Sequence, residues 1–167
     1  MLHLQIIDSP VGALTLATRS DRLCLVHFGA DRPAAETMLR RWYHDGSITE
    51  PSGPMPVAER LACYFAGEPA ALDGIDVELN GTPFQQRVWQ ALRDVRAGQT
   101  ASYGDIARRI GVPNAVRAVG AANGANPVPI VVPCHLIIGS SGSLTGYGGG
   151  LERKRWLLRH EGAQRLF

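Results

Sequence analysis

A cysteine and a histidine stand side by side in the most apolar stretch of the chain, VVPCHLIIG (131–139). A cysteine reacts as its thiolate, which needs a base or a local positive potential to form. His135 could be the base for Cys134, with a carboxylate holding the far ring nitrogen. In a strand, neighbouring side chains point to opposite faces, so contact would need a bend or a bridging water. That geometry disfavours a shared metal ion, and a purely structural histidine is the alternative.

The orienting carboxylate is expected on the C-terminal segment GLERKRWLLRHEG (150–162), which is predicted to be a helix. It offers two candidates, Glu152 and Glu161. Gly162 predicts the end of the helix, so Glu161 falls where the helix dipole disfavours a negative charge. This placement hints at a function for Glu161.

The other cysteines, Cys24 and Cys63, fall on predicted apolar faces and are interpreted as inert packing residues. Three widely spaced cysteines without a CxxC motif predict neither a disulfide framework nor a thiol-rich zinc site. We therefore expect a reducing, cytoplasmic location. The N-terminus does not have the pattern of a secretory signal, and the apolar segment 127–138 is too short to span a bilayer, so no membrane association is expected.

The first thirty residues predict an antiparallel meander. Leu2, Leu4 and Ile6 fall on one face of a strand, which the turn DSPVG follows. Two more strands are predicted from ALTLATR (13–19) and RLCLVHF (22–28).

Helices and a connector are expected to follow the sheet. Apolar spacing predicts one helix over 33–44 and another from about 56 to 65. Residues 67–82 have no clear period and are interpreted as a connector. The chain then divides into an α/β domain, residues 1–80, and a second domain, residues 81–167.

The second domain is predicted to be mostly helical. A helix over 83–95 has Thr82 as its expected N-cap. Ser102 and Asp105 resemble a capping box for a short helix that ends at Gly111.

A further helix, roughly 115–123, completes a helix-turn-helix pattern, with Asn114 as its expected N-cap. Its residues are mostly alanine, valine and glycine, with Arg117 as its one basic residue. Such small residues permit close backbone approach to a partner, while a tightly packed core helix is the alternative.

The two predicted domains also differ in charge. Residues 1–82 carry six arginines against eleven acidic residues, whereas residues 83–167 carry eleven basic residues against four acidic ones. This asymmetry suggests an anionic partner for the second half, although a solvated basic face is the alternative. Sixteen of the seventeen basic residues are arginine, whose planar guanidinium suits phosphates and bases.

Four ordered blocks in the second half resemble the O6-alkylguanine-DNA alkyltransferases, also called methylated-DNA–protein-cysteine methyltransferases. The turn DSPVG and the segment YFAGE (64–68) in the first half are also similar to that family. The resemblance implies a two-domain α/β (α+β) protein, with a ribonuclease-H-like N-terminal domain and a C-terminal DNA-binding domain. The four blocks are GTPFQQRVWQAL (81–92), SYGDIA (102–107), AVRAVGAANGANPVPIVVPCH (115–135) and GYGGGLERKRWLLRHEG (146–162).

The resemblance implies direct DNA repair by a single, irreversible alkyl transfer. The alkyl group would move from O6-alkylguanine, and from O4-alkylthymine as a further substrate, onto Cys134. His135 would take the thiol proton through a water, and Glu161 would hold the imidazole. Asn126 would support the turn around the site. No cofactor and no metal are implied.

The same resemblance implies that the damaged nucleotide leaves the base stack. Arg117 would fill the gap it leaves, and Tyr103 would help to rotate its phosphate. The partner would be double-stranded DNA containing O6-alkylguanine, bound in its minor groove by a monomer. The residues expected at close approach are Ala115, Ala118, Gly120 and Ala121.

The pocket for the alkylated base is expected under the loop GYGGG (146–150). Tyr147 would pack on the base, and the Gly148 N–H would face its O6 atom. Pro129 and Ile137 are expected to line the pocket. Taken alone, the loop is equally typical of a flexible turn.

Two departures from the family pattern stand out. Leu136 replaces the arginine that usually follows the cysteine and histidine. Cys24, His3 and His27 do not fall where some relatives bind zinc, so no zinc is expected.

Two rival hypotheses belong to other classes. One is a non-enzymatic sensor of alkylated DNA, a class that lacks the acceptor cysteine. The other is a thiol hydrolase or acyltransferase that uses Cys134, His135 and Glu161, which would not predict a helix-turn-helix.

Overall fold

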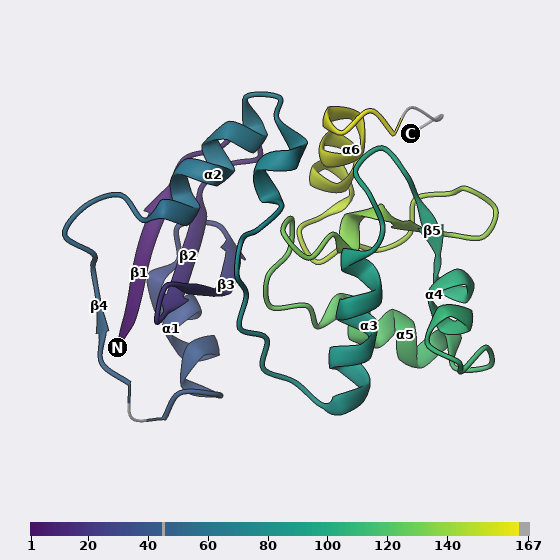
Figure 1. The fold of residues 1–167 in the computed structure, drawn as a ribbon, viewed down its shortest axis with the longest axis horizontal. Coiled ribbons are helices and arrows are strands. Elements are labelled where there is room, and N and C mark those ends of the chain that lie inside the picture. Colours follow the sequence, from purple (N-terminus) through teal and green to yellow (C-terminus); the bar gives the residue numbers. More distant parts are fainter. Residues whose placement is uncertain (45, 164–167) are drawn as a thin grey trace. The chain divides into compact units, whose positions relative to one another are not determined.

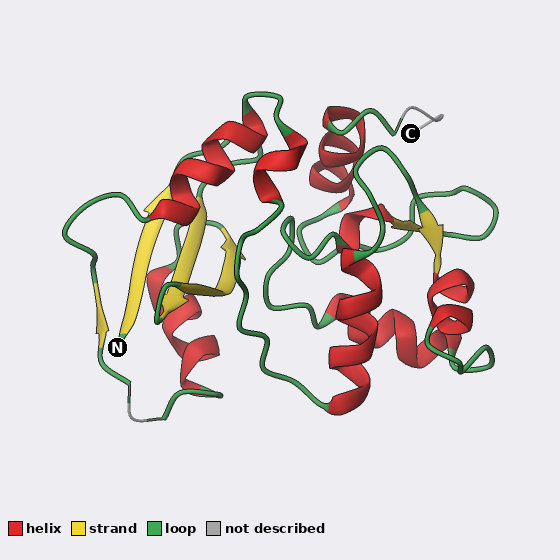
Figure 2. Ribbon diagram, in the orientation of Figure 1, coloured by secondary structure: helices red, strands yellow, loops and turns green. Residues whose placement is uncertain are grey.

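The protein was analysed as a computed structural model, which describes residues 1–44 and 46–163 (Figure 1). The chain divides into two compact units, Met1–Asn80 and Gly81–Phe167. Each unit is described by itself below, and residues 164–167 of the second predicted domain lie outside the described residues. The first unit combines a sheet with helices and the second is mostly helical, as Figure 2 shows, which confirms the predicted α+β fold class.

The sheet of the first unit contains the predicted meander. β1 (Leu2–Ile7), β2 (Leu14–Arg19) and β3 (Arg22–Phe28) pair antiparallel in chain order. Ser20 and Asp21 join β2 to β3 with φ angles of 49° and 62°, and positive φ at both central residues is typical of a tight hairpin turn.

A fourth strand changes the character of the sheet. β4 (Ile48–Thr49) pairs in parallel with β1, so the strand order is β3-β2-β1-β4. The sequence predicts only the antiparallel strands, and the added parallel strand makes the sheet a mixed one. Two residues are too few to give an alternating pattern, which is why β4 is not detectable from the sequence.

Two helices accompany this sheet. α1 is Arg32–Arg40 and α2 is Pro56–Phe65, the second of which has the predicted bounds. α1 ends four residues before the predicted boundary at 44. The chain turns after it because Tyr43 is buried, with its hydroxyl 2.7 Å from an oxygen of Glu78.

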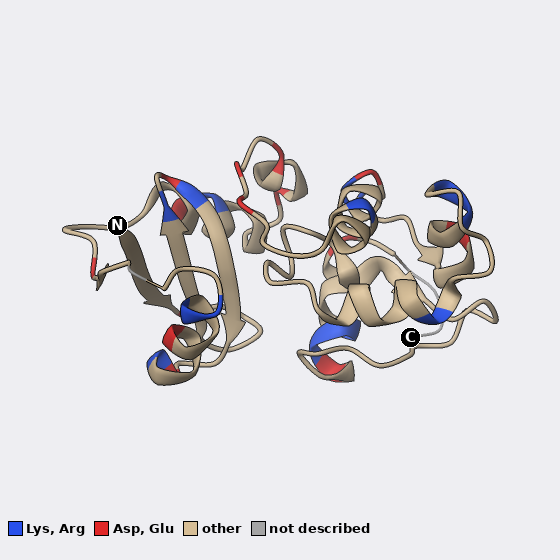
Figure 3. Cartoon of the chain, turned by 90° about the horizontal axis from the view of Figure 1, so that it is seen from below, with Lys and Arg blue, Asp and Glu red and all other residues tan. Residues whose placement is uncertain are grey.

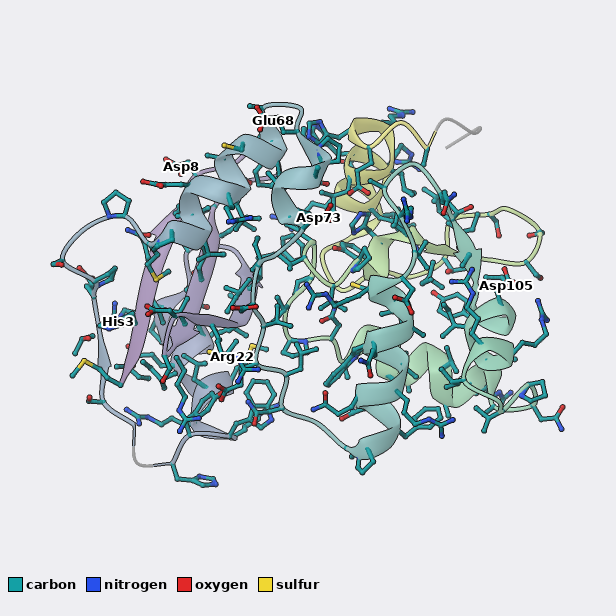
Figure 4. The ribbon with its side chains drawn as sticks, viewed as in Figure 1. His3, Asp8, Arg22, Glu68, Asp73 and Asp105 are labelled. Atoms are coloured by element: carbon teal, nitrogen blue, oxygen red, sulfur yellow. The ribbon has the colours of Figure 1, made fainter. Side chains whose placement is uncertain are left out.

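The predicted connector is structured along part of its length. It contains the 3-10 helix η1 (Pro69–Leu72) and a parallel bridge between Leu23 and Val77. Arg22, at the start of β3 and labelled in Figure 4, donates to the Val77 carbonyl at 2.8 Å. Glu78 forms an ion pair with Arg19 at 2.9 Å. An isolated bridge or an ion pair gives no periodic pattern of apolar residues. These contacts could therefore not be predicted from the sequence of residues 67–82.

The second unit opens with α3 (Pro83–Arg93), capped by Thr82 as predicted. The Trp89 indole donates to the Ala122 carbonyl at 2.8 Å, which fixes α3 against α5 (Val116–Gly124).

The first helix of the helix-turn-helix is α4 (Tyr103–Arg109). The capping box of Ser102 and Asp105 is confirmed, and Asp105 is labelled on α4 in Figure 4. The N-cap of α5 is Ala115, so the prediction of Asn114 is wrong, and no side chain caps this helix. An uncapped N-terminus leaves backbone N–H groups available to other acceptors.

Two short strands complete the second unit. β5 (Ala101–Ser102) pairs in parallel with β6 (Ile137–Ile138), which places the start of α4 beside the segment that follows Cys134. The last helix, α6, is Leu151–His160. No helix among residues 1–44 and 46–163 is long and apolar enough to cross a membrane.

Candidate active site

Cys134 begins a single 3-10 turn, η2 (Cys134–Leu136). Its backbone N–H donates to the Val132 carbonyl at 2.8 Å, and the N–H of Leu136 donates to the Pro133 carbonyl at 3.0 Å. Neighbouring side chains in a 3-10 turn diverge by about 120°, not by the 180° of a strand. The chain therefore has at this point the bend that the sequence analysis gives as one alternative, and Cys134 and its neighbour do not lie on opposite faces of a strand.

His135 is oriented by Glu161. Its Nε2 atom lies 2.6 Å from a carboxylate oxygen of Glu161, and the two side chains are 0% and 3% exposed. Gly162, with a φ of +80°, ends the helix just beyond the glutamate, as predicted. The other candidate, Glu152, is exposed at the opposite end of α6.

The tautomer of His135 follows from this bond. An ionised carboxylate only accepts hydrogen bonds, so Nε2 carries the proton that Glu161 accepts. Nδ1 then holds a free lone pair. That atom is buried and has no hydrogen-bond partner in the described part of the chain. The imidazole is therefore set up to accept a proton at Nδ1, which is the task of a general base.

Asn126 closes the turn that precedes the nucleophile. Its side-chain amide donates to the Val132 carbonyl at 2.8 Å, and its side-chain oxygen accepts from the Val128 N–H at 2.9 Å. Within this turn Ile130 is fully buried and has a φ of +75°. A β-branched residue in this region is strained, so the surrounding packing must hold it there.

Burial raises the pKa of the Cys134 thiol, since a thiolate is poorly solvated in this site. Three side chains act in the opposite direction: the polar groups of Asn126 and Tyr147, and the positive charge of Lys154. At 5% exposure, Cys134 is nearly closed to solvent. The thiol proton therefore needs an acceptor inside the protein. Three predicted site residues act on the thiol or on its base: Asn126 and Tyr147 on Cys134, and Glu161 on His135.

Lys154 is a site residue that the sequence analysis missed. It lies on α6, is 0% exposed, and its Nζ donates to the carbonyls of Ile137 and Thr145. Burial lowers its pKa to about 8, and the charge of Cys134 opposes that shift. The composition contains an indication that Lys154 is unusual, because it is the single lysine in a chain with sixteen arginines. Its compact ammonium acts as a point charge between two carbonyls, unlike the planar guanidinium of arginine.

Leu136, the departure from the family pattern, is a core residue. It is 0% exposed, and the neighbouring Ile137 is also completely buried. The position therefore contributes apolar packing at the end of the 3-10 turn.

The loop 139–150 is fixed to its surroundings at Thr145. The Thr145 hydroxyl lies 2.8 Å from the hydroxyl of Tyr103, at the start of α4. Tyr147 is half-buried, Gly148 is exposed, and a Cβ atom at Gly148 would meet nothing within 4 Å. Tyr147 is one of the side chains that lower the pKa of Cys134, while Gly148 lies on the exposed side of the loop.

Small residues form the outer face of α5. Arg117, Ala118 and Ala121 are exposed, whereas Ala115 and Gly120 are half-buried. A Cβ atom at Gly120 would lie 3.8 Å from the Tyr103 ring, so the tyrosine rests against this helix. Figure 3 marks the basic residues on the ribbon; α4 carries Arg108 and Arg109 in its last turn. The face can approach a polyanion closely.

The remaining predicted residues are placed as follows. Pro129 and Ile137 are buried on either side of Cys134 in the sequence, and their contact with a bound base stays a prediction. Cys24 is buried, which raises its pKa to about 12, in agreement with an inert packing role. Cys63 is exposed on α2, so its predicted burial is wrong. Among the residues that the structure describes, no group of three His, Cys, Asp or Glu side chains could hold a metal ion.

Two sequence families match this chain. The "6-O-methylguanine DNA methyltransferase, DNA binding domain" matches residues 83–163, and the "6-O-methylguanine DNA methyltransferase, ribonuclease-like domain" matches residues 2–79. Similar proteins include the methylated-DNA–protein-cysteine methyltransferase of Salmonella typhimurium, 48% identical over 93% of each chain. The protein of the same name from Mycobacterium tuberculosis is 47% identical over 96% of this chain and 93% of its own.

Solved structures resemble the whole chain. The crystal structure of Mycobacterium tuberculosis OGT in complex with DNA has a TM-score of 0.81 and 44% identity, and covers 96% of this chain and 93% of its own. An O6-methylguanine-DNA methyltransferase from Pyrococcus kodakaraensis has a TM-score of 0.67 and 27% identity, and covers 97% of this chain and 99% of its own.

Proposed function

The chain belongs to the 6-O-methylguanine DNA methyltransferase family, and from that premise we propose which of its residues carry the reaction and how they reach the damaged base. The protein is an enzyme of direct DNA repair, a methylated-DNA–protein-cysteine methyltransferase. It binds DNA and moves an alkyl group from the DNA to a cysteine of its own chain.

Cys134 is the acceptor in this proposal, and the Glu161–His135 pair beside it is the observation that carries the assignment. His135 takes the thiol proton at Nδ1 through a water. The sulfur then bonds to the alkyl carbon, the bond between that carbon and O6 breaks, and its electron pair stays on guanine. The proton held by His135 is available to neutralise the departing base. A thioether offers no comparable leaving group, so each molecule acts once.

The substrate is O6-alkylguanine in duplex DNA, with O4-alkylthymine as a further candidate. Cys134 is 5% exposed, so a base inside the stack cannot reach it. The nucleotide must therefore rotate out of the duplex. The small exposed residues of α5 support close approach in the minor groove, with Arg117 filling the gap and Tyr103 contacting the rotated nucleotide.

The loop 146–150 covers the rotated base in this proposal. Tyr147 packs on the ring, and the N–H of Gly148 donates to O6 as negative charge develops there. Pro129 and Ile137 form apolar walls. The enzyme acts as a monomer in the cytoplasm, and it needs only its own side chains for this step.

Intact-mass measurement tests the assignment directly. The protein is incubated with a duplex oligonucleotide containing O6-methylguanine, beside Cys134→Ala and the matched control Cys63→Ser. Wild type and Cys63→Ser should each gain one methyl group, and Cys134→Ala should gain none. DNA binding without any mass change would instead favour the damage sensor. Failure to bind DNA would favour the thiol hydrolase.

A further inference from the structure

Two hydroxyl groups meet between the helix-turn-helix and the loop over the site. The hydroxyls of Tyr103 and Thr145 lie 2.8 Å apart, and 42 positions separate the two residues. Tyr103 opens α4, whereas Thr145 lies in the loop 139–150. In the proposed function the Tyr103 hydroxyl contacts the rotated nucleotide. A residue that hydrogen-bonds to this hydroxyl therefore also controls its orientation toward the nucleotide.

Thr145 is itself held in place by its surroundings. Its carbonyl accepts a hydrogen bond from Lys154 Nζ at 3.4 Å, and the same ammonium donates to the carbonyl of Ile137. One buried cation therefore ties Thr145 to the segment that follows Cys134. The backbone of Thr145 is therefore held in place by a hydrogen bond, although the residue lies in a loop.

The methyl group of Thr145 is confined on the side of Gly139. A Cβ atom at Gly139 would lie 3.3 Å from Thr145 Cγ2, so this methyl occupies the space that a side chain at that position would need. β-branched side chains have few χ1 choices, so this confinement and the fixed backbone together direct the hydroxyl toward Tyr103. On its other side, the Tyr103 ring lies against Gly120 of α5.

We propose that Thr145 is a positioning residue for Tyr103, an inference that rests on the proposed function. A tyrosine hydroxyl has one proton to donate and can accept as well. When Thr145 donates to the Tyr103 oxygen, the tyrosine proton is free and directed to the phosphate or base of the rotated nucleotide. A hydrogen bond accepted by a hydroxyl also strengthens the one it donates. Thr145 thus acts on DNA through Tyr103.

A double-mutant cycle tests this role in the full-length protein. The single-turnover rate of methyl transfer is measured at saturating O6-methylguanine duplex for wild type, Thr145→Val, Tyr103→Phe and the double variant. Thr145→Val should slow transfer roughly tenfold, the effect of one lost hydrogen bond. In the Tyr103→Phe background the same change should add less than about twofold, because no hydroxyl remains to be positioned.

Two further variants separate positioning from loop stability. Thr145→Ser keeps the hydroxyl and should recover most of the rate. Ser143→Ala removes the hydroxyl that lies 3.1 Å from Ser141 in the same loop and should change the rate less than twofold. DNA affinity should be nearly the same for wild type and the Thr145 and Ser143 single variants.

Three outcomes would overturn the proposal: equal slowing by Thr145→Val with or without the Tyr103 hydroxyl, equal slowing by Ser143→Ala, or full speed in Thr145→Val. Failure of the proposed function looks different, because wild type itself would then transfer no methyl group.

Discussion

The carboxylate of Glu161 and the imidazole of His135 lie 2.6 Å apart in a buried pair, although 26 positions separate them in the chain. The glutamate follows the last turn of α6, and the histidine lies in the middle of a 3-10 turn. With an ionised Glu161, this contact places the imidazole proton on Nε2. It also explains why an acidic residue tolerates an unfavourable end of a helix.

Replacing Glu161 by glutamine tests this pair. The glutamine amide can donate to Nε2, which moves the imidazole proton to Nδ1 and removes the lone pair that accepts the thiol proton. We expect methyl transfer to slow roughly 100-fold, the low end of general-base contributions. Single-turnover rates measured by intact mass check this. Glu152→Gln makes the same chemical change at an exposed site on α6 and should leave the rate unchanged; equal rates for both variants would contradict the role of Glu161.

Lys154→Met should change how stability depends on pH. The pKa of Lys154 is about 8 in the fold against 10.5 in an exposed lysine. Between these two values the unfolded chain binds the proton and the folded chain does not. The free energy of unfolding of wild type should therefore rise with pH across this window, relative to the variant, by up to about 3 kcal/mol.

Urea unfolding of both proteins at pH 7 to 10.5 measures this difference. Taking the difference between the two proteins cancels groups that Lys154 does not influence, such as Cys24, and both proteins carry Cys134→Ala so that the coupled thiol is absent. Parallel stability curves would show that the Lys154 amine titrates like an exposed one.

The positive φ of Ile130 predicts that glycine at this position gives a more stable protein than alanine. At an ordinary buried site, alanine is more stable than glycine. With a φ of +75°, the order should reverse, and Ile130→Gly should be more stable than Ile130→Ala by about 1 kcal/mol. Val132 is equally buried and provides the matched pair, for which alanine should remain the better residue. Denaturant unfolding of all four variants decides the order; the ordinary order at Ile130 contradicts the strain.

Restoring the family arginine should harm this protein. Leu136 is completely buried, so Leu136→Arg places a guanidinium in apolar surroundings. We expect a loss of roughly 3 kcal/mol or more in unfolding free energy, without any gain in transfer rate. Leu136→Met conserves volume and should cost less than about 1.5 kcal/mol. An arginine variant as stable as wild type would show that the site holds an unrecognised acceptor for the charge.

Arg117→Ala should slow methyl transfer from duplex DNA but not the reaction with a free base. The side chain is exposed on α5, so its loss leaves the buried site intact. Transfer from O6-methylguanine in duplex DNA should slow at least tenfold, since an unfilled gap favours return of the base to the stack. Reaction with free O6-benzylguanine should change little. Arg41→Ala removes an equal charge from an exposed site in the first unit and provides the control; equal slowing on both substrates would rule out the gap-filling role.

Local residue types determined much of this protein from the sequence alone. The β1–β3 meander, the bounds of α2 and the caps at Thr82 and Ser102 all follow from spacing over a few residues. Those features depend on contacts between near neighbours, which the order of residues specifies directly. The family resemblance then identified the chemistry, because its blocks include the residues that bear it.

Tertiary structure decided the rest. It placed Cys134 in a 3-10 turn, paired Glu161 with His135, buried Lys154 and brought Thr145 to Tyr103. Apart from the 3-10 turn, each of these depends on segments that are far apart in the chain, and local pattern carries no information about which of them meet. The same reason explains the errors: a two-residue strand, an uncapped helix and an exposed cysteine are all settled by packing against distant elements rather than by their neighbours in sequence.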